Sequence, residues 1–342
     1  MKSVRLGVAV FKPACKAIGT AACMASLGAS ALSAETLSVE GVYGSQVDIP
    51  SDIEVIAMEN LGGTVGPDVA LELSDALGSV YIEGQPYFQI VPAALTGASQ
   101  VVLINRTESG PEQIRVDNPN APDAVLLGRV RLTSQDRRVE DKVVKECIAK
   151  DDRGKCVERE EFRTRCDEFV MRLNPRIRLL AADGAQLYSK TNQRSETVRY
   201  CADEDTQIDA DAMEEKMVRE LISEIRADIA PSERREGIRI MESRKGLVSE
   251  DREPFRDAVR LTQNDPYGAC LAFGALEQRN PEHVSVLFNI GLCHEGEGNL
   301  AEARQYYERA LALEPDKTYP NQGINRIYNR ERGEAQMAAR NR

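Results

Sequence analysis

The spacing of hydrophobic residues changes along the chain, and each change predicts a different kind of element. Residues 53–91 contain an apolar run, a glycine-containing loop, a stretch with helical spacing and a second apolar run, which is typical of strand, loop, helix and strand. From Ala124 a long series of strand-like segments follows, and helical spacing returns over Ile208–Ile229. The pattern predicts an α/β (α+β) domain with a mostly antiparallel sheet and long hairpins.

The dipeptide Asp183-Gly184 stands between two strand-like runs and predicts a two-residue hairpin turn. If that register continues along both strands, Cys166 lies directly opposite Cys201. A bulge at Pro175 would shift the register by one residue. The register therefore predicts a disulfide between Cys166 and Cys201.

A further pair, Cys147 and Cys156, brackets a polar turn and is expected to face across its own hairpin as a disulfide, Cys147–Cys156. Cys270 and Cys293 lie on consecutive predicted helices, where they either form a disulfide or remain small buried residues. We expect no metal site, because the cysteines lack the Cys-x-x-Cys spacing that zinc sites commonly use.

The C-terminal part carries a helical pattern with small residues at fixed intervals. If Val284 is position 1, small residues occupy positions 8, 20 and 27, an aromatic residue occupies 24 and proline occupies 32. These residues are Gly291, Ala303, Ala310, Tyr307 and Pro315. The pattern resembles the tetratricopeptide repeat, in which small residues let two antiparallel helices pack closely. Matching residues 34 positions earlier, Ala269, Phe273 and Pro281, extend it to two repeats and a final capping helix.

The same count places Phe288, Asn289 and Leu292 on the first helix of the repeat. The resemblance implies that such positions line a concave groove, where an Asn amide can pair with the backbone of a bound peptide. We therefore expect these three residues to contact a partner protein, and replacement of Phe288 and Asn289 by Ala to leave the fold intact. The alternative is that a short array fills its groove with its neighbouring domain.

Charge and composition change the picture at the N-terminus. The net charge is −11, yet every charged residue among the first 34 is basic. An uncharged stretch of small and apolar residues, Ala17–Ala34, follows, so residues 1–34 are expected to be an export signal. Lipidation at Cys23 and a retained anchor are the alternatives. The predicted organisation continues with an α/β domain over 35–230, a linker over 231–249 and the repeat domain over 250–342.

Three short motifs of the α/β part resemble the CsgG-like superfamily, which includes the curli-secretion protein, activators of penicillin-binding proteins and the TolB amino-terminal domain. They are Ile53–Met58 with its glycine loop, Pro122–Val130 and Arg178–Ser189. The resemblance implies a protein of the cell envelope that binds other proteins. A membrane pore is disfavoured, because the predicted hairpin around Cys147 and Cys156 carries charges on both strands.

Little in the sequence favours catalysis. Both histidines, His283 and His294, lie in the helical part, and the glycine loop before Asp68 lacks the Gly-Lys-Ser/Thr of a phosphate-binding loop. An acidic chain also disfavours nucleic acid and anionic lipid as partners. We expect a non-enzymatic adaptor without cofactor that is exported, is periplasmic or outer-membrane-associated, and binds envelope proteins through the repeats. The alternative is a subunit of an envelope secretion or assembly complex whose α/β domain forms a ring.

Overall fold

The computed structural model describes residues 35–93, 100–107, 110–117 and 121–342, with side chains described outside 94–120. Residues 35–342 form one unit by the contacts of their backbone. The predicted export signal, and with it Cys23, lies outside the described residues. In the part of the chain that is described, no helix combines the length and apolar character needed to cross a membrane.

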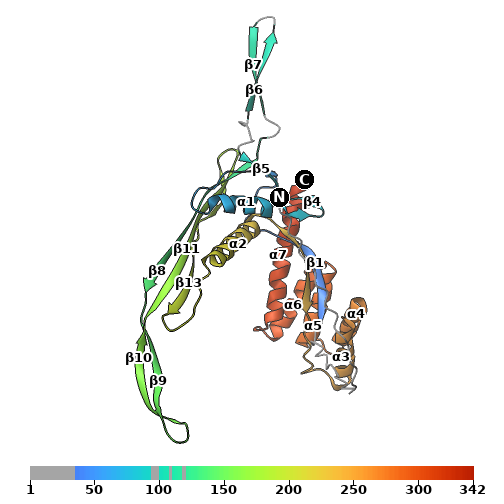
Figure 1. Cartoon of the computed structure of the whole chain (residues 1–342). Coiled ribbons are helices and arrows are strands. Elements are labelled where there is room, and N and C mark those ends of the chain that lie inside the picture. The colour runs from blue at the N-terminus through green and yellow to red at the C-terminus, as the bar shows by residue number, and fades with distance from the viewer. Residues whose placement is uncertain (1–34, 94–99, 108–109, 118–120) are drawn as a thin grey trace, which may run out of the picture. The chain divides into compact units, whose positions relative to one another are not determined.

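The central sheet is mixed (Figure 1). Its strand order is β12-β11-β8-β2-β5, with β13 also paired to β11. The bounds are β2 Val55–Met58, β5 Gln89–Pro92, β8 Ala124–Arg138, β11 Cys166–Ala181, β12 Gln186–Lys190 and β13 Arg194–Cys201. β2 runs parallel to both β5 and β8, whereas β8, β11, β12 and β13 are antiparallel. The predicted antiparallel sheet is therefore only partly confirmed, because the helical crossover between β2 and β5 makes that pair parallel.

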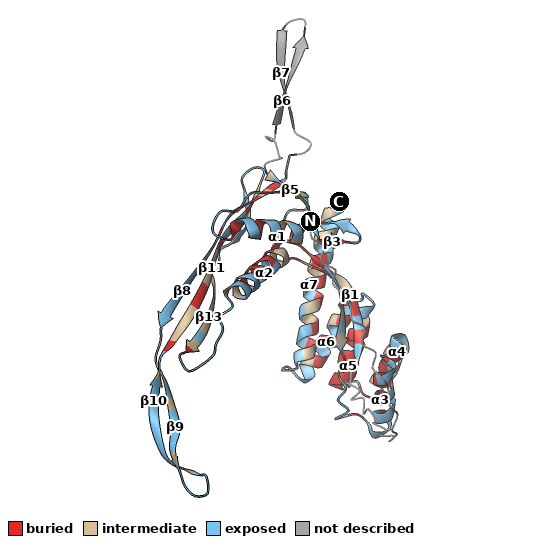
Figure 2. Cartoon of the chain, viewed as in Figure 1, coloured by how far each residue is buried: buried red, intermediate tan, exposed pale blue. Residues whose placement is uncertain are grey.

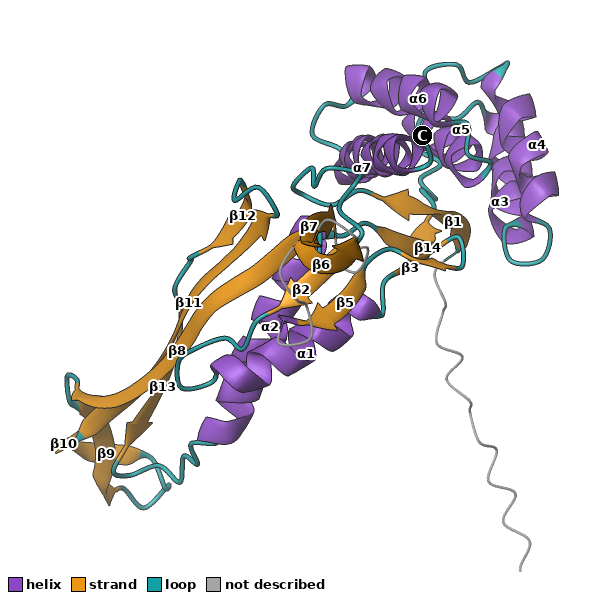
Figure 3. Cartoon of the chain, turned by 90° about the horizontal axis from the view of Figure 1, so that it is seen from above, coloured by secondary structure: helices purple, strands orange, loops and turns teal. Residues whose placement is uncertain are grey.

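Two helices lie along one face of this sheet (Figure 3). Helix α1, Gly66–Gly78, has Pro67 in its first turn and buries an apolar stripe that includes Leu73. Helix α2, Ala210–Ile229, is capped by the Asp209 side chain, which accepts a hydrogen bond from the backbone N–H of Ala212. Their apolar faces and the inner face of the sheet form one core.

The hairpin that joins β11 and β12 differs from the predicted turn by one residue. The Ala181 N–H donates to the carbonyl of Ala185, which closes a three-residue loop, and Gly184 has a φ of +89°. A bulge beyond the loop then shifts the register back by one residue. The two offsets cancel, and Cys166 lies opposite Cys201 between β11 and β13, as predicted.

The second long hairpin consists of β9, Lys142–Lys150, and β10, Cys156–Thr164, and most of its residues are exposed (Figure 2). Its register departs from the prediction. Arg159 lies opposite Cys147 and Lys150 opposite Cys156, because the turn over residues 151–155 is centred on Arg153 and not midway between the two cysteines. The shifts on the two sides of Glu158 cancel. The two cysteines are nevertheless joined, with Cα atoms 5.7 Å apart.

Three further strand pairs complete the sheets. β1, Thr36–Tyr43, pairs antiparallel with β14, Ser232–Arg239. The segment that we expected to link two domains therefore contains a strand whose partner lies near the start of the described chain. The remaining pairs are β3 with β4, at Tyr81–Ile82 and Gln85–Pro86, and β6 with β7, at Gln100–Thr107 and Gly110–Asp117.

The C-terminal part is helical. A short 3-10 turn, η2 at Ser249–Asp251, precedes α3 Arg252–Leu261, α4 Pro266–Glu277, α5 Val284–Gly296, α6 Leu300–Leu313 and α7 Thr318–Arg340. We call α3–α7 the helical module. Its core also contains Leu37 and Val39 of β1, so the paired strands β1 and β14 pack on the module.

Tyr307 of α6 packs its ring against both α5 and α7, so that three helices of the module meet at this side chain. The side chain is fully buried, and a methyl group added at Gly291 of α5 or at Gly323 of α7 would lie 2.7 or 2.5 Å from its ring. Only glycine lets both helices approach the ring this closely. Ala303 and Ala310, two further small residues predicted for the repeat, are also fully buried, and Pro315 follows the end of α6.

Candidate functional site

The inner surface of the helical module holds a segment of the same chain. The side-chain amide of Asn289 donates to the backbone carbonyl of Met241 at 3.0 Å and accepts from the backbone N–H of Met241 at 2.9 Å. Asn289 itself is fully buried. A carboxamide that pairs with both the N–H and the carbonyl of one residue binds an extended backbone whatever side chain that residue carries. The contact expected for a bound peptide is therefore made within the chain.

Phe288 and Leu292 are equally inaccessible. The Phe288 ring stacks on Tyr319 of α7 with centroids 5.8 Å apart and tilts against Tyr307 at 5.4 Å. Leu292 belongs to the core that includes the β1 residue Leu37. The structure thus brings the three predicted site residues together, but with partners from the same chain. Their use by a partner protein stays a prediction that requires residues 240–248 to leave.

Two polar residues before α5 hold the rest of this segment, and the sequence analysis missed them. His283 lies within hydrogen-bond distance of the Lys245 carbonyl through Nε2, at 3.0 Å, while its Nδ1 accepts from the backbone N–H of Val286. Burial lowers the pKa of His283, although the hydrogen bond to Lys245 opposes that shift. The neutral ring, with its proton on Nε2, therefore both caps α5 and fixes residue 245.

The second of these residues is Asn280, which follows α4. Its Oδ1 accepts from the backbone N–H of Val248 at 3.0 Å, and its amide donates to the buried carboxylate of Asp251 at 2.6 Å. Arg279 forms an ion pair with the same carboxylate. Burial opposes ionisation of Asp251, yet these hydrogen bonds keep the pKa of its carboxyl below the usual value. An Asn-x-x-His spacing just before a repeat helix was the only sequence signal for this clamp.

A buried charge joins α5 to α7. Glu295 is fully buried, and its carboxylate accepts two hydrogen bonds from Arg326, at 2.9 and 2.7 Å, and one from the Tyr307 hydroxyl at 2.6 Å. Arg330 donates to the Glu295 backbone carbonyl at 2.7 Å. Burial and the adjacent carboxylate raise the pKa of Tyr307 well above its usual value. Because every acceptor oxygen is occupied, this group holds helices together and offers no free acid or base.

One apolar hollow of about 220 Å³ remains open on the module. It lies between α4, α5 and β1, and Leu292 and the Cys270–Cys293 disulfide line it together with Tyr267. Tyr267 is 69% exposed, and Leu271, one helical turn later, is 60% exposed. We call Tyr267, Leu271 and the hollow the α4 surface. Together with the hollow, these two side chains form an exposed apolar patch, and contiguous patches of this kind mark interaction surfaces in other proteins.

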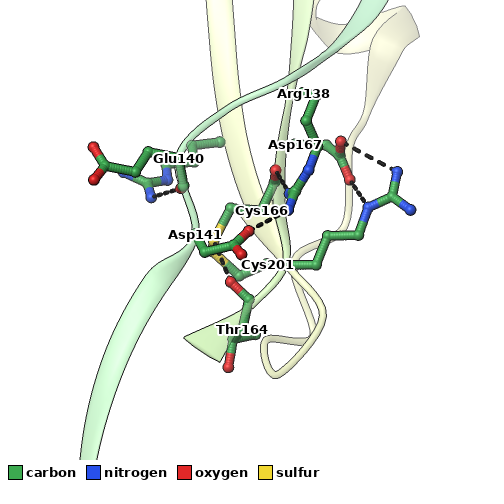
Figure 4. A network of polar contacts seen from close by, with 9 residues as sticks. Arg138, Glu140, Asp141, Thr164, Cys166, Asp167 and Cys201 are labelled. Atoms are coloured by element: carbon green, nitrogen blue, oxygen red, sulfur yellow. Dashed lines mark hydrogen bonds and ion pairs between the residues drawn. A yellow bond between two sulfur atoms is a disulfide. The ribbon is translucent and has the colours of Figure 1, made fainter. Parts of the chain in front are cut away.

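The polar cluster at the base of the β9–β10 hairpin is structural (Figure 4). Arg138 donates to the carbonyl of Cys166 and pairs with Asp141, beside the disulfide between Cys166 and Cys201. Cys201 also lies near two carboxylates, those of Asp203 and Glu204. Lys142 binds both carboxylates and the Cys201 sulfur is bonded, so this group provides no thiolate for a metal.

The comparisons with known proteins agree with the helical module. The tetratricopeptide repeat family matches residues 284–317, which begin at the Val284 predicted as the first position and contain α5 and α6. No curated protein matches the chain. The CsgG-like resemblance and the export signal stay predictions. The helical module of this chain contains a tetratricopeptide repeat.

Proposed function

We propose that this chain is a non-catalytic adaptor that engages a protein partner through the α4 surface of its helical module. The match of a tetratricopeptide repeat to α5 and α6 carries the proposal, because such repeats commonly serve protein interactions. The groove residues Phe288 and Asn289 are occupied within the chain, whereas Tyr267 and Leu271 are exposed. A partner can therefore reach the α4 surface without displacing any segment.

The proposed adaptor works in the periplasm and has no catalytic role. Three disulfides favour an oxidising compartment such as the periplasm. The contacts of both histidines support the proposed non-catalytic role, because each histidine serves the helical packing. His283 caps α5, and His294 stacks on Tyr306 with ring centroids 5.4 Å apart. The partner is then an envelope protein that presents an apolar segment to Tyr267.

A capture experiment in intact cells tests the proposal. Cells that express the tagged protein are crosslinked, and proteins recovered with it are quantified by mass spectrometry. The variant Tyr267→Ser/Leu271→Ser is compared with a control, Leu313→Ser/Tyr328→Ser, which removes an exposed Leu and an exposed Tyr from α6 and α7. The proposal expects loss of one or more partners only in the first variant, with unchanged circular dichroism in both. Equal recovery from all three proteins would contradict it.

The second candidate function is a subunit of a ring-forming envelope complex. It rests on the CsgG-like resemblance of the α/β part. Mass photometry of the purified protein separates the two functions, because a ring gives one discrete high oligomer and an adaptor gives a monomer or dimer.

A further inference from the structure

The outer face of the central sheet carries a cluster of arginines. Side chains alternate between the two faces of a strand, so Leu173, Ile177 and Leu179 of β11 face the core, and the exposed Arg176 and Arg178 face outward. Helices α1 and α2 cover the inner face (Figure 3). The exposed outward residues include two arginines of β8 and two of β11. They are Arg129, Arg131, Arg176 and Arg178, which we call the arginine face.

These four side chains lack partners in the part of the chain that the structure describes. None of them forms an ion pair or donates a side-chain hydrogen bond there, whereas Arg137, further along β8, pairs with Glu168 at 2.7 Å. Arg176 even lies directly opposite Arg129 in the strand pairing. Like charges placed opposite each other destabilise a sheet. The chain as a whole has a net charge of −11, so a general excess of basic residues does not explain the cluster.

The arginine face is hollowed and polar. Two adjoining hollows of about 370 and 450 Å³ share Arg129, Arg176 and Thr191 in their lining. The other lining residues are Gly128, Arg131, Thr133, Asn174, Pro175, Arg178, Ser189 and Gln193. The lining therefore combines guanidinium groups with hydroxyls and amides, and it contains neither a carboxylate nor an aromatic ring. Such a surface selects for negative charge rather than for apolar contact.

We propose that the arginine face binds an extended, acidic segment of a protein partner. Arginines two residues apart on one strand lie about 6.8 Å apart, and alternate side chains of an extended peptide have the same spacing. The strand pairing places the arginines at three successive levels, which are Arg131, the opposed pair Arg129 and Arg176, and Arg178. A peptide with Asp or Glu at every second position can thus place one carboxylate at each level, and the planar fork of Arg binds a carboxylate through two hydrogen bonds. This surface lies on the sheet and is separate from the α4 surface proposed above.

Nucleic acid fits the same face less well. Single-stranded DNA or RNA is usually held by aromatic side chains that stack on its bases, and the lining has none. A nucleic acid also carries a charge on every nucleotide, so the net charge of −11 opposes it more than a peptide charged only at alternate residues. A short acidic peptide is attracted mainly by the four arginines themselves, because salt screens charges that lie more than about a Debye length away.

Fluorescence anisotropy with a labelled probe tests the proposal on the purified, disulfide-intact protein. The probe is an octapeptide of alternating Glu and Thr, compared with its Lys–Thr counterpart and with a single-stranded DNA of similar length. The test variant is Arg129→Gln/Arg176→Gln. The control, Arg219→Gln/Arg235→Gln, removes two exposed arginines of α2 and β14 and changes the net charge equally.

The proposal expects the Glu–Thr probe to bind, the Lys–Thr probe not to bind, and the affinity of the test variant to fall about tenfold or more relative to the control. Binding should weaken as salt is raised. Failure of the Glu–Thr probe to bind, or an equal loss in both variants, would overturn the proposal. Tighter binding of DNA would assign the face to nucleic acid, and salt-sensitive self-association abolished only in the test variant would assign it to a second copy. Either result would also overturn the proposal.

Discussion

Replacement of Asn289 by Ala tests whether residues 240–248 are held by the helical module. The substitution removes the carboxamide that pairs with both backbone groups of Met241. A buried polar group without a partner costs about 1–3 kcal/mol, and Met241 is only partly buried, so the low end applies to each group. The expected loss in the free energy of unfolding is about 2–3 kcal/mol, larger than the change that an exposed site would give.

Urea unfolding followed by circular dichroism measures this loss, and hydrogen exchange locates it. In Asn289→Ala, amides of residues 240–248 should exchange faster than in the parent protein, because local opening no longer breaks the two hydrogen bonds. The control Asn325→Ala makes the same chemical change at an exposed position inside α7 and should cost less than about 0.5 kcal/mol. If Asn289→Ala were as stable as this control and exchange at 240–248 were unchanged, the clamp would be refuted.

Four further perturbations have expected outcomes. Gly323→Ala should destabilise by about 1–3 kcal/mol in urea unfolding, because its methyl would meet the buried tyrosine ring, whereas Gly274→Ala, with open space around it, should be neutral or stabilising. Burial lowers the pKa of His283, so stability should be complete above the ordinary pKa of 6.5 and fall as pH drops through the lowered value, a slope that His283→Gln should remove from melting temperatures. Reduction of Cys166–Cys201 should cost about 3–4 kcal/mol on the chain-entropy model, and thiol mapping should find the bond in native material. Arg176→Gln should raise the free energy of unfolding at low salt by about 0.2–1 kcal/mol, because it removes a like-charge cross-strand pair, and a decrease would contradict the repulsion.

The repeat was predictable because its information is local. Small residues at fixed spacing around Tyr307 specify which helices can pack closely, and the structure places Gly291 and Ala303 where the pattern predicts. Gly323 completes the same contact from α7, but it lies outside the matched residues 284–317. A periodic pattern within one element therefore identified the fold of the repeat without identifying all of its partners.

Contacts between distant segments were not predictable in this way. Asn289 indicated a peptide-binding position, but nothing near it showed that Met241 would be the peptide. The predicted opposition of Cys166 and Cys201 is correct only because a longer turn and a bulge cancel. In the other hairpin, the turn is centred on Arg153, and no further shift brings Cys147 opposite Cys156. Single-residue register shifts depend on local backbone geometry that the hydrophobic pattern does not contain.

Site-specific photocrosslinking tests the proposed function most directly. A photoreactive phenylalanine analogue replaces Tyr267 on the α4 surface, and in separate strains it replaces Tyr328 on α7 or Phe288 in the occupied groove. The proposal predicts that illumination of intact cells gives a covalent adduct with a partner protein at position 267 and none at position 328. At position 288, only attachment to the chain itself is expected, since that side chain is fully buried. Adducts to a partner at 288 but not at 267 would contradict the proposal and place the partner in the groove.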